Sequence, residues 1–199
     1  MDKSNPVLQA IHDYVREQFA EDATGHDYYH MVRVVRMAKE IAKQEGGDLF
    51  VCEAAGWLHD IGDKKLFSDP GKARVDMDVF LSDLAIEKHT IQEIHLAIND
   101  VSFSKGKIPN TLEGKIVQDA DRLDALGAIG IARVFAYGGS RDQLIYHEKV
   151  TNDTSVDHFY EKLLLLKNLM NTQSAKEIAK ERHAFMEAYL KQFFIEWKG

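Results

Sequence analysis

Val51-Cys52-Glu53-Ala54-Ala55-Gly56-Trp57-Leu58-His59-Asp60 is the stretch that decides the fold of this chain. Its apolar residues form a helical run that ends in an adjacent histidine and aspartate. Such a pair occurs by chance in many proteins, but here His30 lies upstream on another apolar helical face and Asp121 lies downstream. Imidazoles and carboxylates that face a core are costly to bury unless something pairs with them. A divalent metal ion is the simplest partner for this group.

The composition is that of one soluble globular core, with 199 residues, 45% of them hydrophobic and 29% charged. The formal net charge of −7 argues against a nucleic-acid polymer as partner, because such polymers bind to basic surfaces. A small anionic substrate remains compatible with this charge if a metal ion and a few local cations hold it.

No targeting or membrane segment is visible in the sequence. The first apolar stretch, from Val7 to Phe19, is interrupted by charged residues and does not resemble a signal peptide. No segment approaches the roughly 18 uncharged apolar residues that a membrane span needs. The single cysteine, Cys52, excludes an intrachain disulfide, and its apolar surroundings predict a buried thiol in a reducing compartment. We therefore expect a soluble, cytoplasmic protein.

Helical periodicity runs through nearly the whole chain and predicts an all-α fold. Asn5-Pro6 is a start signal for the first helix, and Gly46-Gly47 is a stop signal for the second. Asp48 can cap the helix that follows. We expect a single domain over residues 1–199, with a helical C-terminal extension over about 155–199.

Two regions break the helical pattern. Asp63 to Val75 contains Pro70 and Gly71 and directly follows the His-Asp pair, so we expect a loop there. Tyr137 to Thr154 holds two adjacent glycines and many polar residues, which indicates a connection that could contain a short extended piece or hairpin.

The geometry of a helix decides whether the candidate ligands can converge. His30 shares a face with Ile41 and other apolar residues, and therefore points inward. His59 and Asp60 lie about 100° apart around an ideal helix. Both can reach one ion only near a helix end, and Gly62 marks such an end. Taken singly, His30 would more often be a packed core histidine and the His-Asp pair a solvated helix end, but their combination favours a metal site.

The third segment offers a choice of carboxylates. Asp119 and Asp121 lie about 200° apart on an ideal helix, so only one of them can face the site. We choose Asp121, because it shares its face with Ala125 and Ala128, whose small side chains would admit other helices. Asp124, one turn later, is the second choice or a carboxylate that supports the ligands from behind.

Two neutral histidines and two carboxylates would neutralise a divalent ion and leave coordination positions open. Mixed nitrogen and oxygen ligands suit Mn, Fe, Co, Ni or Zn, and the thiolates of a closed structural zinc site are missing. Such an ion activates water and withdraws charge from a phosphoryl oxygen. An open site of this kind indicates catalysis.

Five segments carry a resemblance to a known family. They are Gly25-His26-Asp27-Tyr28-Tyr29-His30-Met31-Val32-Arg33-Val34, Trp57-Leu58-His59-Asp60-Ile61-Gly62-Asp63-Lys64-Lys65, Val117-Gln118-Asp119-Ala120-Asp121-Arg122-Leu123-Asp124-Ala125-Leu126-Gly127-Ala128-Ile129-Gly130, Phe135-Ala136-Tyr137-Gly138-Gly139 and His158-Phe159-Tyr160-Glu161-Lys162-Leu163. The chain is similar to the HD superfamily of metal-dependent phosphohydrolases, in particular to a bacterial branch of small HD hydrolases that includes a manganese-dependent nucleoside triphosphate pyrophosphohydrolase. The resemblance extends over nearly the whole chain.

This resemblance implies an all-helical HD domain with the ligands His30, His59, Asp60 and Asp121. It also implies a divalent cofactor, with manganese as first choice and Mg, Fe, Co, Ni or Zn as alternatives. The alarmone hydrolases of the same superfamily have an acidic pair shortly after their His-Asp. Here Asp63 matches the first acid but Lys64 replaces the second, so the alarmone reaction does not transfer directly.

Phosphate chemistry needs a proton acceptor for the attacking water and positive charge where oxyanions develop. Asp63, one turn beyond Asp60, is our candidate acceptor, and a loop-capping role is its alternative. Lys64 is a catalytic candidate that would stabilise a pyrophosphate leaving group, and Lys65 would bind the same polyphosphate. Lysines in loops are usually only solvated, which is the alternative for both.

Further candidates are assigned by their position near the ligands. Arg33 could bind substrate, or could pair structurally with Asp27. His26 and Asp27 could orient the metal ligands from behind. Lys105 could bind substrate next to Phe103, whose ring could stack on a base.

The leading hypothesis is therefore a metal-dependent phosphohydrolase that acts on a small nucleotide. The resemblance suggests cleavage of a (deoxy)nucleoside triphosphate to monophosphate and pyrophosphate. The alternatives are a nucleoside monophosphate phosphatase, an alarmone hydrolase, and a non-catalytic metal- or nucleotide-binding sensor. The sequence leaves the oligomeric state open, with a homodimer as one possibility.

Overall fold

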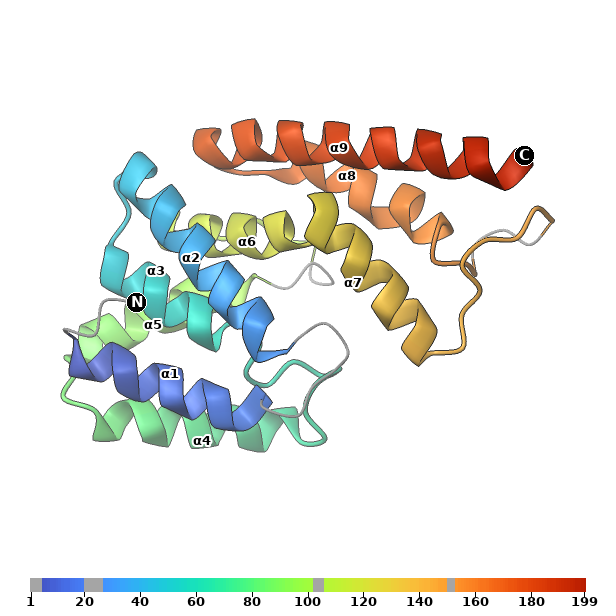
Figure 1. The fold of residues 1–199 in the computed structure, drawn as a ribbon. Coiled ribbons are helices and arrows are strands. Elements are labelled where there is room, and N and C mark those ends of the chain that lie inside the picture. Colours follow the sequence, from blue (N-terminus) through green and yellow to red (C-terminus); the bar gives the residue numbers. More distant parts are fainter. Residues whose placement is uncertain (1–4, 20–26, 102–105, 150–152) are drawn as a thin grey trace. The chain divides into compact units, whose positions relative to one another are not determined.

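The computed structural model describes residues 5–19, 27–101, 106–149 and 153–199, and these form two compact units (Figure 1). The boundary between the units follows Ala120 and falls inside a helix. All regular elements in the described ranges are helices and none is a strand, which confirms the predicted all-α fold. The single domain and its C-terminal extension stay predictions.

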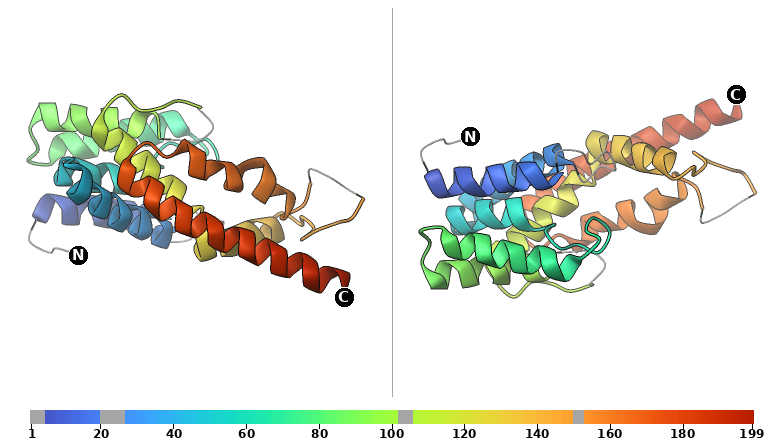
Figure 2. Two further views of the ribbon diagram at one scale, coloured as in Figure 1. Left: turned by 90° about the horizontal axis from the view of Figure 1, so that it is seen from above. Right: turned by 90° about the horizontal axis from the view of Figure 1, so that it is seen from below.

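The first unit is built around α3 (Leu49–Leu58), a short helix whose side chains are almost all buried. The helices α1 (Pro6–Phe19), α2 (Tyr28–Glu45) and α5 (Lys88–Asn99) pack against it. Figure 2 shows α3 between α1 on one side and α5 on the other. The unit also contains α4 (Pro70–Asp83) and α6 (Leu112–Asp124) as far as Ala120. This arrangement buries the run from Val51 to Leu58 and positions the residues that follow it.

Local signals explain where these helices begin and end. The Asn5 carboxamide oxygen accepts from the Val7 backbone N–H at 3.0 Å, and Asp48 accepts from Val51 at 2.9 Å. Gly46 ends α2 in the left-handed conformation with φ 78°, which favours glycine. The three signals confirm the predicted boundaries.

One predicted loop is wrong in its second half. Residues 63–69 form a turn-rich connection, but α4 begins at Pro70. Asp69 accepts from the Lys72 backbone N–H at 2.9 Å, and proline occupies the first turn, where no intrahelical donor is needed. The weak amphipathic pattern of α4, whose buried residues are Met77 and Leu81, explains why periodicity missed it.

Two further side chains of the first unit are fully buried, and the burial of Cys52 confirms the prediction from the sequence. Cys52 is fully buried, and burial, with smaller contributions from Glu113 and Asp48, raises the pKa of its thiol to about 12. Gln118 on α6 is also fully buried and donates to the carbonyl oxygen atoms of Asp100 and Lys107 at 2.8 and 2.9 Å.

The second unit begins at Asp121 and is also helical. It contains α7 (Gly127–Ser140) and α9 (Gln173–Lys198), which pack together. Between them a continuous helical stretch changes type, from a π-helix (Phe159–Leu163) through α8 (Leu164–Leu166) to a 3-10 turn (Lys167–Leu169).

The connection after α7 begins later than predicted, because α7 continues through Tyr137 and both adjacent glycines to Ser140. Ser155 and Val156 donate backbone hydrogen bonds to the carbonyl oxygen atoms of Leu144 and Ile145, at 2.9 and 3.0 Å. No described residue of this connection is assigned to a strand. Among the helices that the structure describes, none is both long and apolar enough to cross a membrane.

Candidate metal centre

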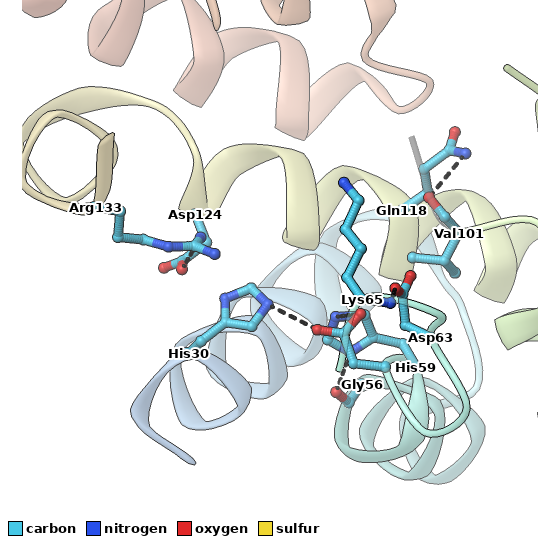
Figure 3. A network of polar contacts seen from close by, with 10 residues as sticks. His30, Gly56, His59, Asp63, Lys65, Val101, Gln118, Asp124 and Arg133 are labelled. Atoms are coloured by element: carbon cyan, nitrogen blue, oxygen red, sulfur yellow. Dashed lines mark hydrogen bonds and ion pairs between the residues drawn. The ribbon is translucent and has the colours of Figure 1, made fainter. Parts of the chain in front are cut away.

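The start of α2 and the end of α3 bring His30, His59 and Asp60 together. The imidazole ring centroids of His30 and His59 lie 5.4 Å apart in an edge-to-face arrangement. One carboxylate oxygen of Asp60 lies 3.6 Å from His30 Nε2, and the other lies 3.5 Å from His59 Nε2 (Figure 3). Both imidazoles are buried, with side-chain exposures of 0% and 1%. The carboxylate therefore bridges two buried rings.

The tautomer of His59 follows from its second ring nitrogen. His59 Nδ1 lies 2.9 Å from the Gly56 carbonyl oxygen, which can only accept, so Nδ1 carries the proton. In the neutral imidazole, Nε2 then directs a lone pair toward Asp60. A cation between this lone pair and the Asp60 carboxylate would be attracted to both, and a backbone carbonyl on Nδ1 is the usual support of a metal-binding histidine. This donor set fits a divalent cation.

The loose backbone after α3 lets both members of the His-Asp pair turn to one side. α3 ends at Leu58, and a turn follows in which Asp63 N donates to Asp60 O at 3.1 Å. Gly62 has φ 76° in this turn. The predicted convergence of His30, His59 and Asp60 at a helix end is thus what the structure shows.

Asp27 supports the site through the backbone. Its carboxylate accepts from the His30 backbone N–H at 2.7 Å and caps α2 at the turn that carries His30. Arg33, one turn further along, is half-buried. His26, the other residue predicted to orient the ligands, lies outside the described residues.

The connection after the His-Asp pair shows the capping role that was the alternative for Asp63. One carboxylate oxygen of Asp63 accepts from the Lys65 backbone N–H at 2.8 Å (Figure 3). The Lys64 and Lys65 side chains are exposed. Lys105, the remaining predicted substrate contact, lies outside the described residues.

Arg74 is a cation near this turn that the sequence did not indicate. Its guanidinium donates to the Gly62 carbonyl oxygen at 3.2 Å. A Cβ atom on Gly62 would lie 2.7 Å from Arg74 Cγ, so glycine is required for this close approach. The Asp69-Pro70 start signal is the one feature of the sequence that indicates a helix carrying Arg74, in a segment predicted to be a loop.

The carboxylates of α6 differ in burial. Asp119 is completely buried within the first unit, whereas Asp121 opens the second unit and is half-buried. Asp124 is buried and forms a 2.7 Å ion pair with Arg133 (Figure 3). Arg182 donates to the Leu123 carbonyl oxygen at 2.6 Å. Contacts within the second unit therefore hold the last turn of α6.

Comparison with known proteins supplies the family. The model of the HD domain family matches residues 27–126, about half of the chain. The Bacillus subtilis protein YpgQ is 37% identical over 191 residues, which cover 92% of this chain and 90% of YpgQ. The chain belongs to the HD domain family.

Solved structures agree with this assignment to the HD family. A Lactobacillus plantarum protein matches with a TM-score of 0.86 and 39% identity, covering 98% of each chain. An HD-superfamily hydrolase from Bacillus thuringiensis matches at 0.81 and 42% identity, covering 96% of this chain and 97% of that one. The crystal structure of B. subtilis YpgQ in complex with ADP matches at 0.82 and 35%, covering 95% and 97%.

Membership of the HD family makes this protein a hydrolase of the metal-dependent phosphohydrolase class. HD domains bind divalent metal ions, and His30, His59 and Asp60 offer ligand atoms of the kind that such ions take. The geometry of the three side chains and the family assignment thus point to the same chemistry.

Proposed function

We propose that this HD enzyme hydrolyses (deoxy)nucleoside triphosphates to monophosphates and pyrophosphate, with manganese as the preferred divalent ion. The observation that carries the proposal is the Asp60 carboxylate between two buried imidazoles, an arrangement suited to a cation. The complex of YpgQ with ADP supports a nucleotide as the ligand class.

We further propose Asp121 as the fourth ligand beside His30, His59 and Asp60. His30, His59 and Asp121 are a combination of side chains that could hold a metal ion. Two neutral imidazoles and two carboxylates would balance the charge of a divalent ion and leave coordination positions open for water or substrate. When bound, such an ion supplies Lewis acidity toward water and toward a phosphoryl oxygen.

The chain's own residues would complete the reaction. The water oxygen forms a bond to the α-phosphorus, the bond from that phosphorus to the bridging oxygen breaks, and pyrophosphate leaves with the electron pair. Asp63 accepts the proton of the water, while Lys64 stabilises the charge that develops on the leaving group. Arg33, Lys65 and Lys105 bind the substrate.

His26, Asp27 and Asp124 act on the ligands rather than on the substrate in this proposal. Asp27 does so through its cap on the His30 backbone. Asp124 does so through the last turn of α6, which its ion pair with Arg133 holds.

Product analysis tests the cleavage mode directly. Deoxyadenosine triphosphate is incubated with the protein and Mn²⁺, and phosphorus NMR monitors the reaction. We expect deoxyadenosine monophosphate and pyrophosphate as products. If the only products are deoxyadenosine diphosphate and orthophosphate, the proposal is contradicted. Inactivity toward every triphosphate together with activity on monophosphates would replace it with a phosphatase function.

A further inference from the structure

His12 on α1 is a buried histidine outside the proposed ligand set. Only 8% of its surface is exposed. Its Nδ1 lies 2.7 Å from a carboxylate oxygen of Asp13, and its Nε2 lies 2.7 Å from the Tyr28 hydroxyl. Both ring nitrogens are therefore engaged by side chains.

The chemistry of these partners sets the direction of the hydrogen bonds. The carboxylate of Asp13 only accepts, so His12 Nδ1 donates to it. In the neutral imidazole, Nε2 then accepts the proton of the Tyr28 hydroxyl. Gln9 donates to the same Asp13 oxygen at 2.9 Å and holds the carboxylate in place. The result is a fixed chain of contacts from α1 to Tyr28.

This chain ends at the two helix ends that carry the candidate ligands. Tyr28 is the first residue of α2, two positions before His30. Trp57 lies two positions before His59, and its ring meets the His12 ring edge-on at 5.1 Å. The Tyr28 and Trp57 rings also stack on each other at 6.1 Å. One imidazole thus contacts a residue two positions before each candidate histidine ligand.

We propose that His12 is a positioning residue of the metal centre. By holding Tyr28 and Trp57, it fixes the start of α2 against the end of α3, and so sets the separation of His30 and His59. The inference rests on the proposed function, because it assumes that the two imidazoles bind a metal ion. Residues that orient metal ligands in this indirect way typically change metal affinity by about 10- to 100-fold when they are replaced.

Three substitutions separate positioning from general stability. His12→Leu removes the hydrogen bond to the Tyr28 hydroxyl and the edge-on contact with the Trp57 ring. Tyr28→Phe removes only the hydroxyl and keeps the ring that stacks on Trp57. His12→Gln places a polar atom near the position of Nε2 and serves as the conservative rescue. His95→Leu is the matched control, since His95 also pairs with a carboxylate, that of Asp78 on α4 at 3.2 Å.

The measurements are the Kd for Mn²⁺ by isothermal titration calorimetry and the melting temperature of the metal-free protein. We expect His12→Leu and Tyr28→Phe to weaken Mn²⁺ binding by about 10-fold or more. His12→Gln should recover most of this loss, and His95→Leu should bind Mn²⁺ like the wild type. The melting temperature of metal-free Tyr28→Phe should stay close to that of the wild type.

Two results would overturn the inference, and they can be told apart. If the wild type binds Mn²⁺ and both His12→Leu and Tyr28→Phe bind it equally well, His12 has only a packing role and the proposed function is untouched. If the wild type itself binds no divalent ion, the metal centre and the inference fail together.

Discussion

One carboxylate oxygen of Asp63 accepts from the Lys65 backbone N–H and stabilises the turn. Because this contact needs only one oxygen, the structural and chemical roles of Asp63 can be tested separately. Asparagine retains an oxygen that can accept from the Lys65 backbone N–H, so Asp63→Asn should keep the turn. It removes the basic carboxylate that we assign as proton acceptor. We expect turnover at saturating substrate and Mn²⁺ to fall about 100-fold or more, the usual scale for a general acid–base group, with metal content unchanged.

Asp69→Asn is the control for this prediction. Asp69 caps the next helix in the same way, with one oxygen 2.9 Å from the Lys72 backbone N–H, and we assign it no catalytic role. Its substitution should leave turnover at the wild-type level. Equal turnover of Asp63→Asn and the wild type would leave Asp63 as a capping residue only, and proton transfer would have to be assigned elsewhere.

Some single residues of the site could be recognised from the sequence because their signals are local. Helical periodicity placed His30 on an inward face, and the helix end at Gly62 allowed His59 and Asp60 to converge. The contacts of His12 and Arg74 could not be recognised in this way. His12 contacts Tyr28 on another helix, and Arg74 contacts Gly62 in the turn after α3, so both contacts depend on tertiary packing.

At the scale of elements, the turn after α3 depends on Gly62. Both Gly62 and Gly46 have positive φ, so alanine at either position costs roughly 1–2 kcal/mol of backbone strain. At Gly62 a Cβ atom would also lie 2.9 Å from the Pro70 backbone oxygen and close to Arg74, whereas at Gly46 nothing lies within 4 Å. Overpacking of this kind costs about 1–3 kcal/mol more.

We therefore predict that Gly62→Ala lowers the free energy of unfolding further than Gly46→Ala does. Urea denaturation of the metal-free proteins measures the difference without any contribution from metal binding. If both variants lose the same free energy of unfolding, α4 can move away from the turn and accommodate the added Cβ atom.

Two kinds of sequence pattern predict the helices, namely capping residues at their ends and apolar periodicity along their length. Asp48 marks the start of a helix that is apolar nearly all round, Gly46 marks the end of a strongly patterned one, and the structure confirms both. α4 was missed because Val75 and Val79 on it are exposed and its apolar residues do not follow one stripe. Its Asp69-Pro70 start is the same signal as Asn5-Pro6, and here the cap alone marks a helix whose periodicity is weak.

At the scale of the whole chain, α6 carries the boundary between the two units. Asp119 belongs to the first unit and Asp121 to the second, and the proposed ligand set includes only Asp121. Within the second unit, Arg122 contacts the Leu169 carbonyl oxygen and Arg182 contacts that of Leu123. These contacts join residues far apart in sequence, so periodicity could suggest Asp121 but could not show what holds its helix.

The metal content of purified variants tests the central claim most directly. We predict that the wild type binds Mn²⁺ and that His59→Ala and Asp60→Ala lose it, because each substitution removes a ligand. Asp121→Ala should lose the metal as well, while Asp119→Ala should keep it. Full metal occupancy in both His59→Ala and Asp60→Ala, measured by elemental analysis after loading with Mn²⁺, would show that these residues do not form the metal centre.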